Sequence, residues 1–382
     1  MKRMGLMGVS IGFFFFSQLS LHGWDPAKRL SWTSGDSELS AIAADSNGHL
    51  HVVWADITPG NKEIFYKKST NQGSTWAPNQ RLTWNSGASL SPGIAVDGLD
   101  NIHVVWTDNS PGNDEIHYRK STNGGSSWTP IQRLTWTSGG SINPAIAIAA
   151  SGALNVVWND ATPGNWEVYF KKSTNEGSTW TPSQRLTFTS GLSFGPAVAV
   201  DPSGNLHVLW SSDAPGNEEI YYKRSTDGGS SWTPSQRLTW NSGWSRGPVI
   251  ATDASGNMHA FWADDTPGNW EIYYKKSIDG GSNWAPNQRL TWNSGYSGSP
   301  AVAVDASGYL HLAWNDDTST SWEIYYKTSM TVGATWSSSQ RLTWNSGFSG
   351  DPAIAVDGFY YIHVTWTDDT PGGYEIYYRR DD

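Results

Sequence analysis

Short apolar runs, each followed by a cluster of Gly, Pro, Asn, Asp or Ser, recur from residue 24 to the end of the chain. Within residues 92–136 four such runs stand out, at 92–97, 102–106, 115–120 and 132–136, and they are rich in β-branched and aromatic residues. Runs of this length with these boundaries are typical of β-strands joined by tight turns. The pattern therefore predicts a unit of four antiparallel strands.

The four-strand unit recurs at a constant interval. Its last strand carries the sequence Arg-Leu-Thr/Ser-Trp/Phe, which begins every 52 residues, at Arg29, Arg81, Arg133, Arg185, Arg237, Arg289 and Arg341. Repeats near 50 residues with four strands each are typical of propeller blades, which avoid exposed sheet edges by closing into a ring. The chain ends after a third strand and begins, at residues 24–32, with a fourth. We predict an all-β fold, a seven-bladed β-propeller over residues 24–382, whose ring is closed by the N-terminal strand completing the last blade.

The first 23 residues differ from the repeats. Lys2 and Arg3 precede an apolar run at 4–16 and a polar stretch at 17–23. This is the layout of a secretory signal, and the apolar run is too short to span a bilayer comfortably. We predict a signal peptide or N-terminal anchor over residues 1–23, and a secreted protein, extracellular or periplasmic, with no membrane span in the mature chain.

Composition narrows the possible partners. The chain has no Cys, and 25 Lys and Arg stand against 35 Asp and Glu, for a formal charge of -10. Disulfide frameworks, thiolate metal sites and cysteine nucleophiles are excluded. An acidic chain lacks the basic surface that nucleic acids require. We expect a monomer that uses no cofactor and no metal and does not bind nucleic acid.

Positions that every unit shares are predicted to serve the fold. Of the 24 Trp, most occupy three repeated places: the end of the second strand, the turn before the fourth strand and the end of the fourth strand. We expect all of these to pack in the core or between blades. A Glu at the start of each third strand is expected to pair with the Arg of the repeated marker. A His recurs on the second strand of six units, with Asn155 in the seventh, and is expected to pack or to bond between strands.

The turn before the fourth strand carries a family resemblance. Residues 225–232 (Ser-Thr-Asp-Gly-Gly-Ser-Ser-Trp) and 277–284 (Ser-Ile-Asp-Gly-Gly-Ser-Asn-Trp) resemble the Asp-box, or BNR repeat, of sialidase-like β-propellers. Three other turns place Asn at the Asp position, and the turn at 329–336 departs with Thr331 and Ala334. In that family the box is a scaffold turn, in which Asp or Asn bonds backbone N–H groups and Trp packs inward.

The resemblance also implies what a catalytic member needs: three arginines for the substrate carboxylate, a Tyr–Glu nucleophile and an Asp acid/base. Arg246 is the one arginine that the predicted fold places on the face bearing the loops between blades, hereafter the loop face. An Arg-Ile/Leu-Pro motif near the N-terminus is also missing. We therefore predict a non-catalytic member of the family, without catalytic residues.

Positions that vary among the units are the candidates for ligand binding. The loop between blades and the loop between the second and third strands emerge on the loop face, and three successive units carry aromatic residues in both. Nearby stand repeated Asn residues and acidic pairs. Aromatic rings beside amide and carboxylate oxygens suit a sugar, whose C–H face packs on rings. The predicted ligand-binding residues are Trp166, Trp244, Trp270, Tyr296, Trp322, Phe348, Tyr374, Asn241, Asn293, Asn345, Asp264, Asp316 and Asp368.

Repeated weak sites on a rigid ring suit a lectin or adhesin, because several sites acting together raise avidity. We predict a secreted, multivalent carbohydrate-binding propeller whose partners are glycans or glycoconjugates. Two alternatives stay open. One is a sialidase-like exo-glycosidase, and the other is a structural or protein-docking propeller, whose loop aromatics only pack against each other.

Overall fold

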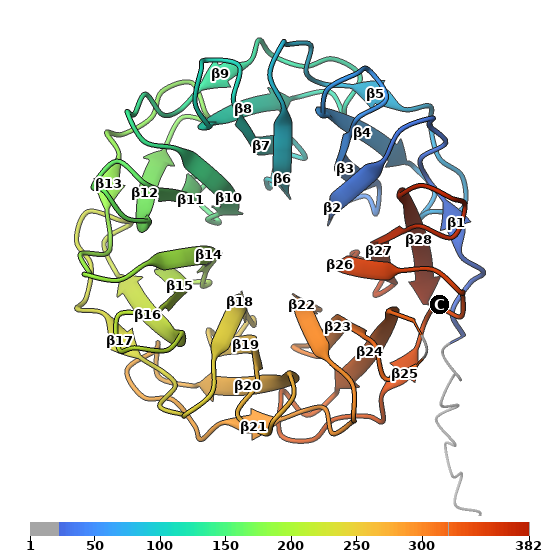
Figure 1. The fold of residues 1–382 in the computed structure, drawn as a ribbon. Helices are drawn as coiled ribbons and strands as arrows, with labels where there is room; N and C mark the ends of the chain where they lie inside the picture. Colours follow the sequence, from blue (N-terminus) through green and yellow to red (C-terminus); the bar gives the residue numbers. More distant parts are fainter. Residues whose placement is uncertain (1–22, 320, 382) are drawn as a thin grey trace, which may run out of the picture.

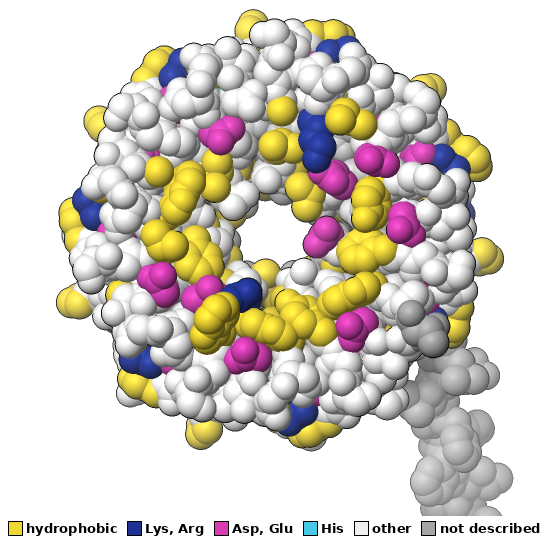
Figure 2. Space-filling view, in the orientation of Figure 1, with side chains coloured by type: hydrophobic (Ala, Val, Ile, Leu, Met, Phe, Trp, Pro, Cys, Tyr) yellow, Lys and Arg dark blue, Asp and Glu magenta, His cyan; other side chains and the backbone are white. Residues whose placement is uncertain are grey.

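A computed structural model describes residues 23–319 and 321–381. Their strands form seven four-stranded antiparallel sheets, arranged in a ring (Figure 1). The space-filling view shows a central opening, the mouth of a channel (Figure 2). The chain is a seven-bladed β-propeller, as the 52-residue period predicts. Residues 1–22, which hold nearly all of the predicted leader, lie outside the described residues. Within the described part, the structure contains no helix long and apolar enough to cross a membrane.

The strands occupy four concentric positions. The innermost strands are β2 (Ser37–Ala44), β6 (Ser89–Val96), β10 (Ser141–Ile148), β14 (Ser193–Val200), β18 (Ser245–Thr252), β22 (Ser297–Val304) and β26 (Ser349–Val356). The second strands are β3 (Leu50–Asp56), β7 (Ile102–Asp108), β11 (Leu154–Asp160), β15 (Leu206–Ser212), β19 (Met258–Asp264), β23 (Leu310–Asp316) and β27 (Ile362–Asp368). The third strands are β4 (Glu63–Ser69), β8 (Glu115–Ser121), β12 (Glu167–Ser173), β16 (Glu219–Ser225), β20 (Glu271–Ser277), β24 (Glu323–Ser329) and β28 (Glu375–Asp381). The outermost strands are β5 (Gln80–Arg81), β9 (Gln132–Arg133), β13 (Gln184–Arg185), β17 (Gln236–Arg237), β21 (Gln288–Arg289), β25 (Gln340–Arg341) and β1 (Lys28–Arg29).

We number the blades 1 to 7 in the order of their innermost strands. Blade 7 joins the two ends of the chain, because β1 pairs with β28 in the register Lys28↔Tyr378 and Arg29↔Tyr377. The backbone N–H of Asp25 donates to the carbonyl of Arg380 (2.8 Å), and Leu30 is buried between the blades. The predicted ring closure is confirmed.

The core lies between neighbouring blades. The Trp that ends each second strand is 0–1% exposed in every blade. The Trp of the turn before each outermost strand packs edge-on against an aromatic ring of the preceding blade; Trp128 and Tyr66, for example, are 5.0 Å apart between ring centroids. For these two groups the predicted packing is confirmed.

For the aromatic residue that follows each outermost strand, the predicted packing is wrong. These rings are 63–74% exposed. In blade 2, the hydroxyl of Thr135 accepts the N–H of Ile116 (2.8 Å), so a side chain takes the place of a backbone carbonyl and the ladder ends there. The next residue, Trp136, therefore leaves the sheet and turns into solvent. The same geometry recurs around the ring at Trp32, Trp84, Phe188, Trp240, Trp292 and Trp344.

The predicted seven-fold ion pair is confirmed. In blade 5 the Nη2 of Arg289 lies 2.6 Å from Oε1 of Glu271, whose side chain is fully buried. The same oxygen accepts the backbone N–H of Asn293 (3.1 Å). Each pair thus ties the third strand to the outermost strand and to the loop that leaves the blade.

The recurring His is part of a buried network, as expected for inter-strand bonding. In blade 5, Nδ1 of His259 lies 2.8 Å from the hydroxyl of Tyr274 on the next strand, and Nε2 lies 3.4 Å from Oδ2 of Asp253. Blade 3 lacks the whole network, because Ala149, Asn155 and Phe170 replace the Asp, His and Tyr. The three residues that share these hydrogen bonds in the other blades are therefore all replaced in blade 3.

This network predicts that acid destabilises the protein. Burial lowers the pKa of His259 from 6.5 to about 4. Burial would raise the pKa of Asp253, but hydrogen bonds from Asn257 and His259 outweigh it and lower the pKa. The unfolded chain therefore binds more protons than the folded chain below pH ~6.5, so stability present at neutral pH falls as the pH drops toward 4. The protonation of His259 alone is expected to lower the free energy of unfolding by about 3 kcal/mol. Urea unfolding at a series of pH values measures it.

The blade 3 residues supply the control. A variant of blade 5 that carries Asp253→Ala, His259→Asn and Tyr274→Phe copies the network-free blade and is expected to lose less stability on acidification than the parent. If the variant and the parent lost equal stability on acidification, the His–Asp–Tyr network would not be the cause of the acid sensitivity.

Candidate functional site

Seven residues of blades 4 to 7 form a continuous arc on the loop face. Arg246 lies over Trp244 (4.7 Å from guanidinium carbon to ring centroid) and over Trp270 (4.6 Å). From Trp270 the rings follow one another at centroid distances of 5.6, 5.0, 6.3 and 5.9 Å, in the order Tyr296, Trp322, Phe348 and Tyr374. Figure 2 shows these hydrophobic side chains gathered beside the central opening. We call this set, from Trp244 to Tyr374, the aromatic arc.

Hydrogen bonds to aspartate side chains fix the loops that carry the arc. The backbone N–H groups of Trp244, Tyr296 and Phe348 donate to the Oδ1 atoms of Asp265, Asp317 and Asp369, at 2.5, 2.5 and 2.6 Å. Each of these acids is the second member of an acidic pair in the sequence. The arc is therefore positioned before any ligand arrives, which lowers the entropy lost on binding.

An ion pair lies at the Trp244 end of the arc. Nε of Arg246 lies 2.9 Å from Oε2 of Glu218, and both side chains are half-buried. Burial raises the pKa of Glu218, although the charge of Arg246 opposes that rise. Sequence reasoning noted Arg246 but missed Glu218, because the two residues are 28 positions apart and in different strands' loops. The available signal was that Glu218 is charged at a loop position where the next three units carry an aromatic residue.

The arc differs in two respects from the predicted set of aromatic residues. Trp166 is not part of it; this ring lies on blade 3, against Gly140. The predicted partners within one unit meet at Tyr296 and Trp322 (5.0 Å) and at Phe348 and Tyr374 (5.9 Å). Contacts also cross from one unit to the next, at 5.6 and 6.3 Å.

The predicted polar residues do not lie in the arc. Asp264, Asp316 and Asp368 are 1–2% exposed. Their Oδ2 atoms accept the amide N–H of Asn241, Asn293 and Asn345, respectively, at 2.6, 2.7 and 2.6 Å. These six residues bond to one another beneath the loops, and we remove them from the set that contacts a ligand of the arc. Across the part of the chain that the structure describes, no three His, Asp or Glu side chains converge as metal ligands would.

The mouth of the central channel carries a second polar group that sequence reasoning missed. A ring of proline and small residues encloses a cavity of about 390 Å³ there, and Asp351 is its charged member. Burial raises the pKa of Asp351, and the nearby charge of Glu38 raises it further. Glu38 itself pairs with Lys62. Asp351 and Glu38 come from opposite ends of the chain, so only ring closure brings them together.

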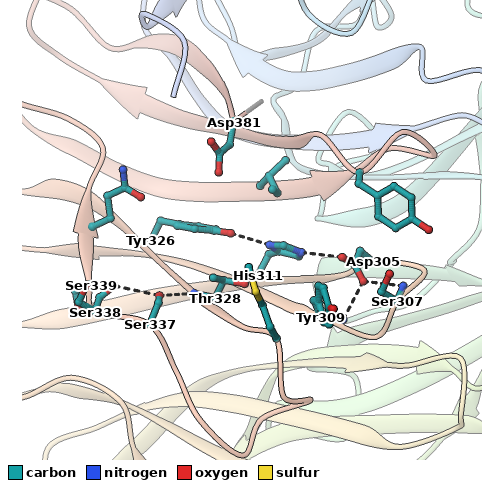
Figure 3. Close-up of a pocket in the computed structure, with 14 residues that line it drawn as sticks. Asp305, Ser307, Tyr309, His311, Tyr326, Thr328, Ser337, Ser338, Ser339 and Asp381 are labelled. Carbon is teal, nitrogen blue, oxygen red and sulfur yellow. Dashed lines mark hydrogen bonds and ion pairs between the residues drawn. The ribbon is translucent and has the colours of Figure 1, made fainter. Parts of the chain in front are cut away.

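A cavity of about 640 Å³ lies between blades 6 and 7, near the chain ends (Figure 3). In blade 5, the corresponding space is filled by a turn of blade 6, where a Cβ on Gly333 would lie 1.9 Å from the hydroxyl of Tyr274. Over Tyr326 the space lies beside residues 23 and 381, where the described part of the chain begins and ends. Nδ1 of His311 lies 2.7 Å from the Tyr326 hydroxyl and its Nε2 3.5 Å from Asp305, which is the network of the other blades. We therefore assign this cavity to ring closure.

Sequence comparisons find no relative: no family model and no curated protein matches the chain. Solved structures share its fold. A protein of unknown function from Dyadobacter fermentans has a TM-score of 0.60 at 13% identity, covering 93% of this chain and 99% of that one. The Hadza microbial sialidase Hz136 has a TM-score of 0.56 at 15% identity, covering 88% and 74%. The α-L-arabinanase of Penicillium chrysogenum, solved with arabinobiose, has a TM-score of 0.55 at 17% identity, covering 77% and 93%.

At these identities the likeness concerns the fold. The structural neighbours of the chain include a sialidase and an arabinanase, whose sequences are 15% and 17% identical to it. Function has to be argued from the side chains of this chain.

Proposed function

We propose that the protein is a secreted, multivalent carbohydrate-binding propeller of the Asp-box type that binds glycans through the aromatic arc and does not cleave them. The observation that carries the proposal is the continuous row of preorganised rings from Trp244 to Tyr374. Half-buried rings side by side offer several adjacent platforms for the C–H faces of consecutive sugars. The sialidase and arabinanase neighbours add support, since both names refer to carbohydrate substrates.

Arg246 and Glu218 supply the polar contacts. A guanidinium donates to ring or hydroxyl oxygens, and a carboxylate accepts from hydroxyl groups. A single sugar subsite of millimolar strength contributes only about 4 kcal/mol. Adjacent subsites on one rigid surface raise the avidity for an extended or clustered glycan roughly 10²–10⁴-fold. We therefore expect binding to depend strongly on glycan length or density.

The test is a glycan array probed with the full chain and with the variant Trp270→Ala/Trp322→Ala. The variant removes two neighbouring platforms and is expected to weaken binding roughly 5- to 150-fold, given ~0.5–1.5 kcal/mol for each ring contact. The matched control is Trp166→Ala, which removes an indole from the equivalent loop of blade 3, outside the arc. Absence of any glycan hit, or equal weakening by the control, would contradict the proposal.

A second function is favoured by one observation at the channel mouth. Asp351, with its raised pKa, and Glu38, which pairs with Lys62, resemble the acid and base pair of a glycosidase. Turnover of a fluorogenic sialoside or arabinofuranoside that disappears in Asp351→Asn would establish an exo-glycosidase in place of a binding protein. No turnover with either substrate would remove this alternative.

Secretion rests on residues 1–23, whose basic start and apolar run support an export signal. N-terminal sequencing of the exported protein tests it, and recovery of the chain in the cytoplasm would contradict it.

A further inference from the structure

The outer edge of the ring exposes seven aromatic side chains, one after each outermost strand. They are Trp32, Trp84, Trp136, Phe188, Trp240, Trp292 and Trp344, and each is 63–74% exposed. Figure 2 shows hydrophobic side chains next to basic ones around this edge. Packing does not explain them, because most of each ring faces water. Soluble proteins seldom keep many large apolar groups exposed without a use.

Each exposed ring lies within 6.0 Å of the guanidinium carbon of an arginine. The guanidinium carbons of Arg341 and Arg379 lie 6.0 and 5.5 Å from the centroid of Trp344. Arg341 is itself fixed, since its Nη2 is 2.5 Å from Oε1 of the buried Glu323 and its Nε donates to the carbonyl of Thr343 (2.6 Å). A platform fixed in this way loses little conformational entropy when a ligand stacks on it.

A cavity adjoins the ring at the junction of two blades. Between blades 6 and 7 it measures about 310 Å³ and is lined by Trp344, Asn345, Asp368, Thr370, Tyr377 and Arg379, among others. The equivalent residues Trp292, Asn293, Asp316, Thr318 and Tyr325 line a cavity of about 150 Å³ between blades 5 and 6. The exposed indole of Trp344 provides an apolar face, and the hydroxyl groups of Thr370 and Tyr377 provide the polar contacts that a single pyranose ring needs. Asn345 and Asp368 bond to each other in the cavity wall.

One junction has lost three of these lining residues together. Between blades 3 and 4, Phe188 replaces Trp, Ser212 replaces Asp and Ala214 replaces the Thr or Ser of the other blades. The Asp and Thr positions are joined by a side-chain hydrogen bond at Thr318, whose hydroxyl donates to Oδ1 of Asp316 (2.5 Å), which explains why those two change together. The ring of Phe188 makes no such bond. A ligand that contacts all three positions would explain why Phe replaces Trp at the same junction.

We propose that the cavities at the blade junctions are a second set of saccharide sites, each accepting one hexopyranose unit against the exposed Trp, and best formed at Trp344. These sites are separate from the aromatic arc. The exposed rings lie at the outer edge of the propeller, whereas the arc lies beside the central opening (Figure 2).

The test measures moles of sugar bound per mole of full chain by equilibrium dialysis. The probes are the radiolabelled methyl glycosides of α-D-mannose, β-D-galactose, β-D-glucose and α-L-fucose. At least one is expected to bind, and Trp292→Ala/Trp344→Ala is expected to weaken that binding at least tenfold. The triple variant Phe188→Trp/Ser212→Asp/Ala214→Thr, which copies the other junctions, is expected to add one bound sugar per chain.

Variants of the arc keep this proposal distinct from the one above. Binding of these monosaccharides that survives Trp270→Ala/Trp322→Ala supports the rim sites. Binding lost in that variant and retained in Trp292→Ala/Trp344→Ala would overturn the rim sites and leave the arc standing. Failure of all four probes to bind would also overturn them. Because the rim rings are mostly exposed, these variants are expected to unfold as the parent does.

Discussion

A chain that begins at Thr33, and so lacks β1, is expected to lose the cooperative unfolding of the closed ring. Leu30 fills a buried position between blades 7 and 1, and burying a Leu contributes about 2–5 kcal/mol. Glu375 is 3% exposed and bonds to Arg29 and Ser31, so truncation leaves a buried carboxylate without these partners. Such a loss costs about 3–5 kcal/mol. Together the two terms approach the whole net stability of a typical domain.

Thermal and urea unfolding of two truncated chains provide the measurement. A chain that begins at Trp24 retains β1 and is the matched control, expected to unfold like the full chain. The chain from Thr33 also frees the edge of β28, which favours aggregation. An unchanged, cooperative transition in the chain from Thr33 would show that the ring does not depend on its N-terminal strand.

Glu271→Ala is expected to destabilise the propeller by about 3–5 kcal/mol, because it leaves the partly buried Arg289 without its charge partner. Glu271 Oε1 also accepts from the side chain of Asn269 (3.2 Å), so the same change frees the loop that carries Trp270. Glu271→Gln keeps an acceptor oxygen and is expected to cost less. Urea unfolding at neutral pH gives these differences directly.

A surface ion pair provides the comparison for this prediction. Lys120 and Glu176 lie 3.2 Å apart, and the Glu side chain is 47% exposed. Lys120→Ala is expected to cost less than about 1 kcal/mol, because water screens such pairs. If Glu271→Ala cost no more than Lys120→Ala, the seven-fold pair would have no special part in stabilising the blades.

Much of the structure of this protein could be predicted from its sequence, because a propeller repeats one four-stranded unit. The strand pattern depends on residues that are neighbours in the sequence, and the 52-residue period and the split of blade 7 follow from counting repeats. The fold, the ring closure and the Glu–Arg pairs could therefore be predicted without coordinates. The aromatic residues of the arc could also be selected, since comparison of one unit with the next separates the variable loop positions from the shared ones.

Three matters were decided only by the tertiary structure. The outermost strand ends at the hydroxyl of a Thr, so the following Trp faces water instead of the core. Asp264 and Asn241 bond to each other under the loops, so they serve the scaffold and not the arc. Arg246 meets Glu218, and Asp351 meets Glu38, only when blades fold against each other and the ring closes. Periodicity in a sequence shows which residues are equivalent, but exposure and partners across blades depend on where strands end and on how neighbouring blades pack.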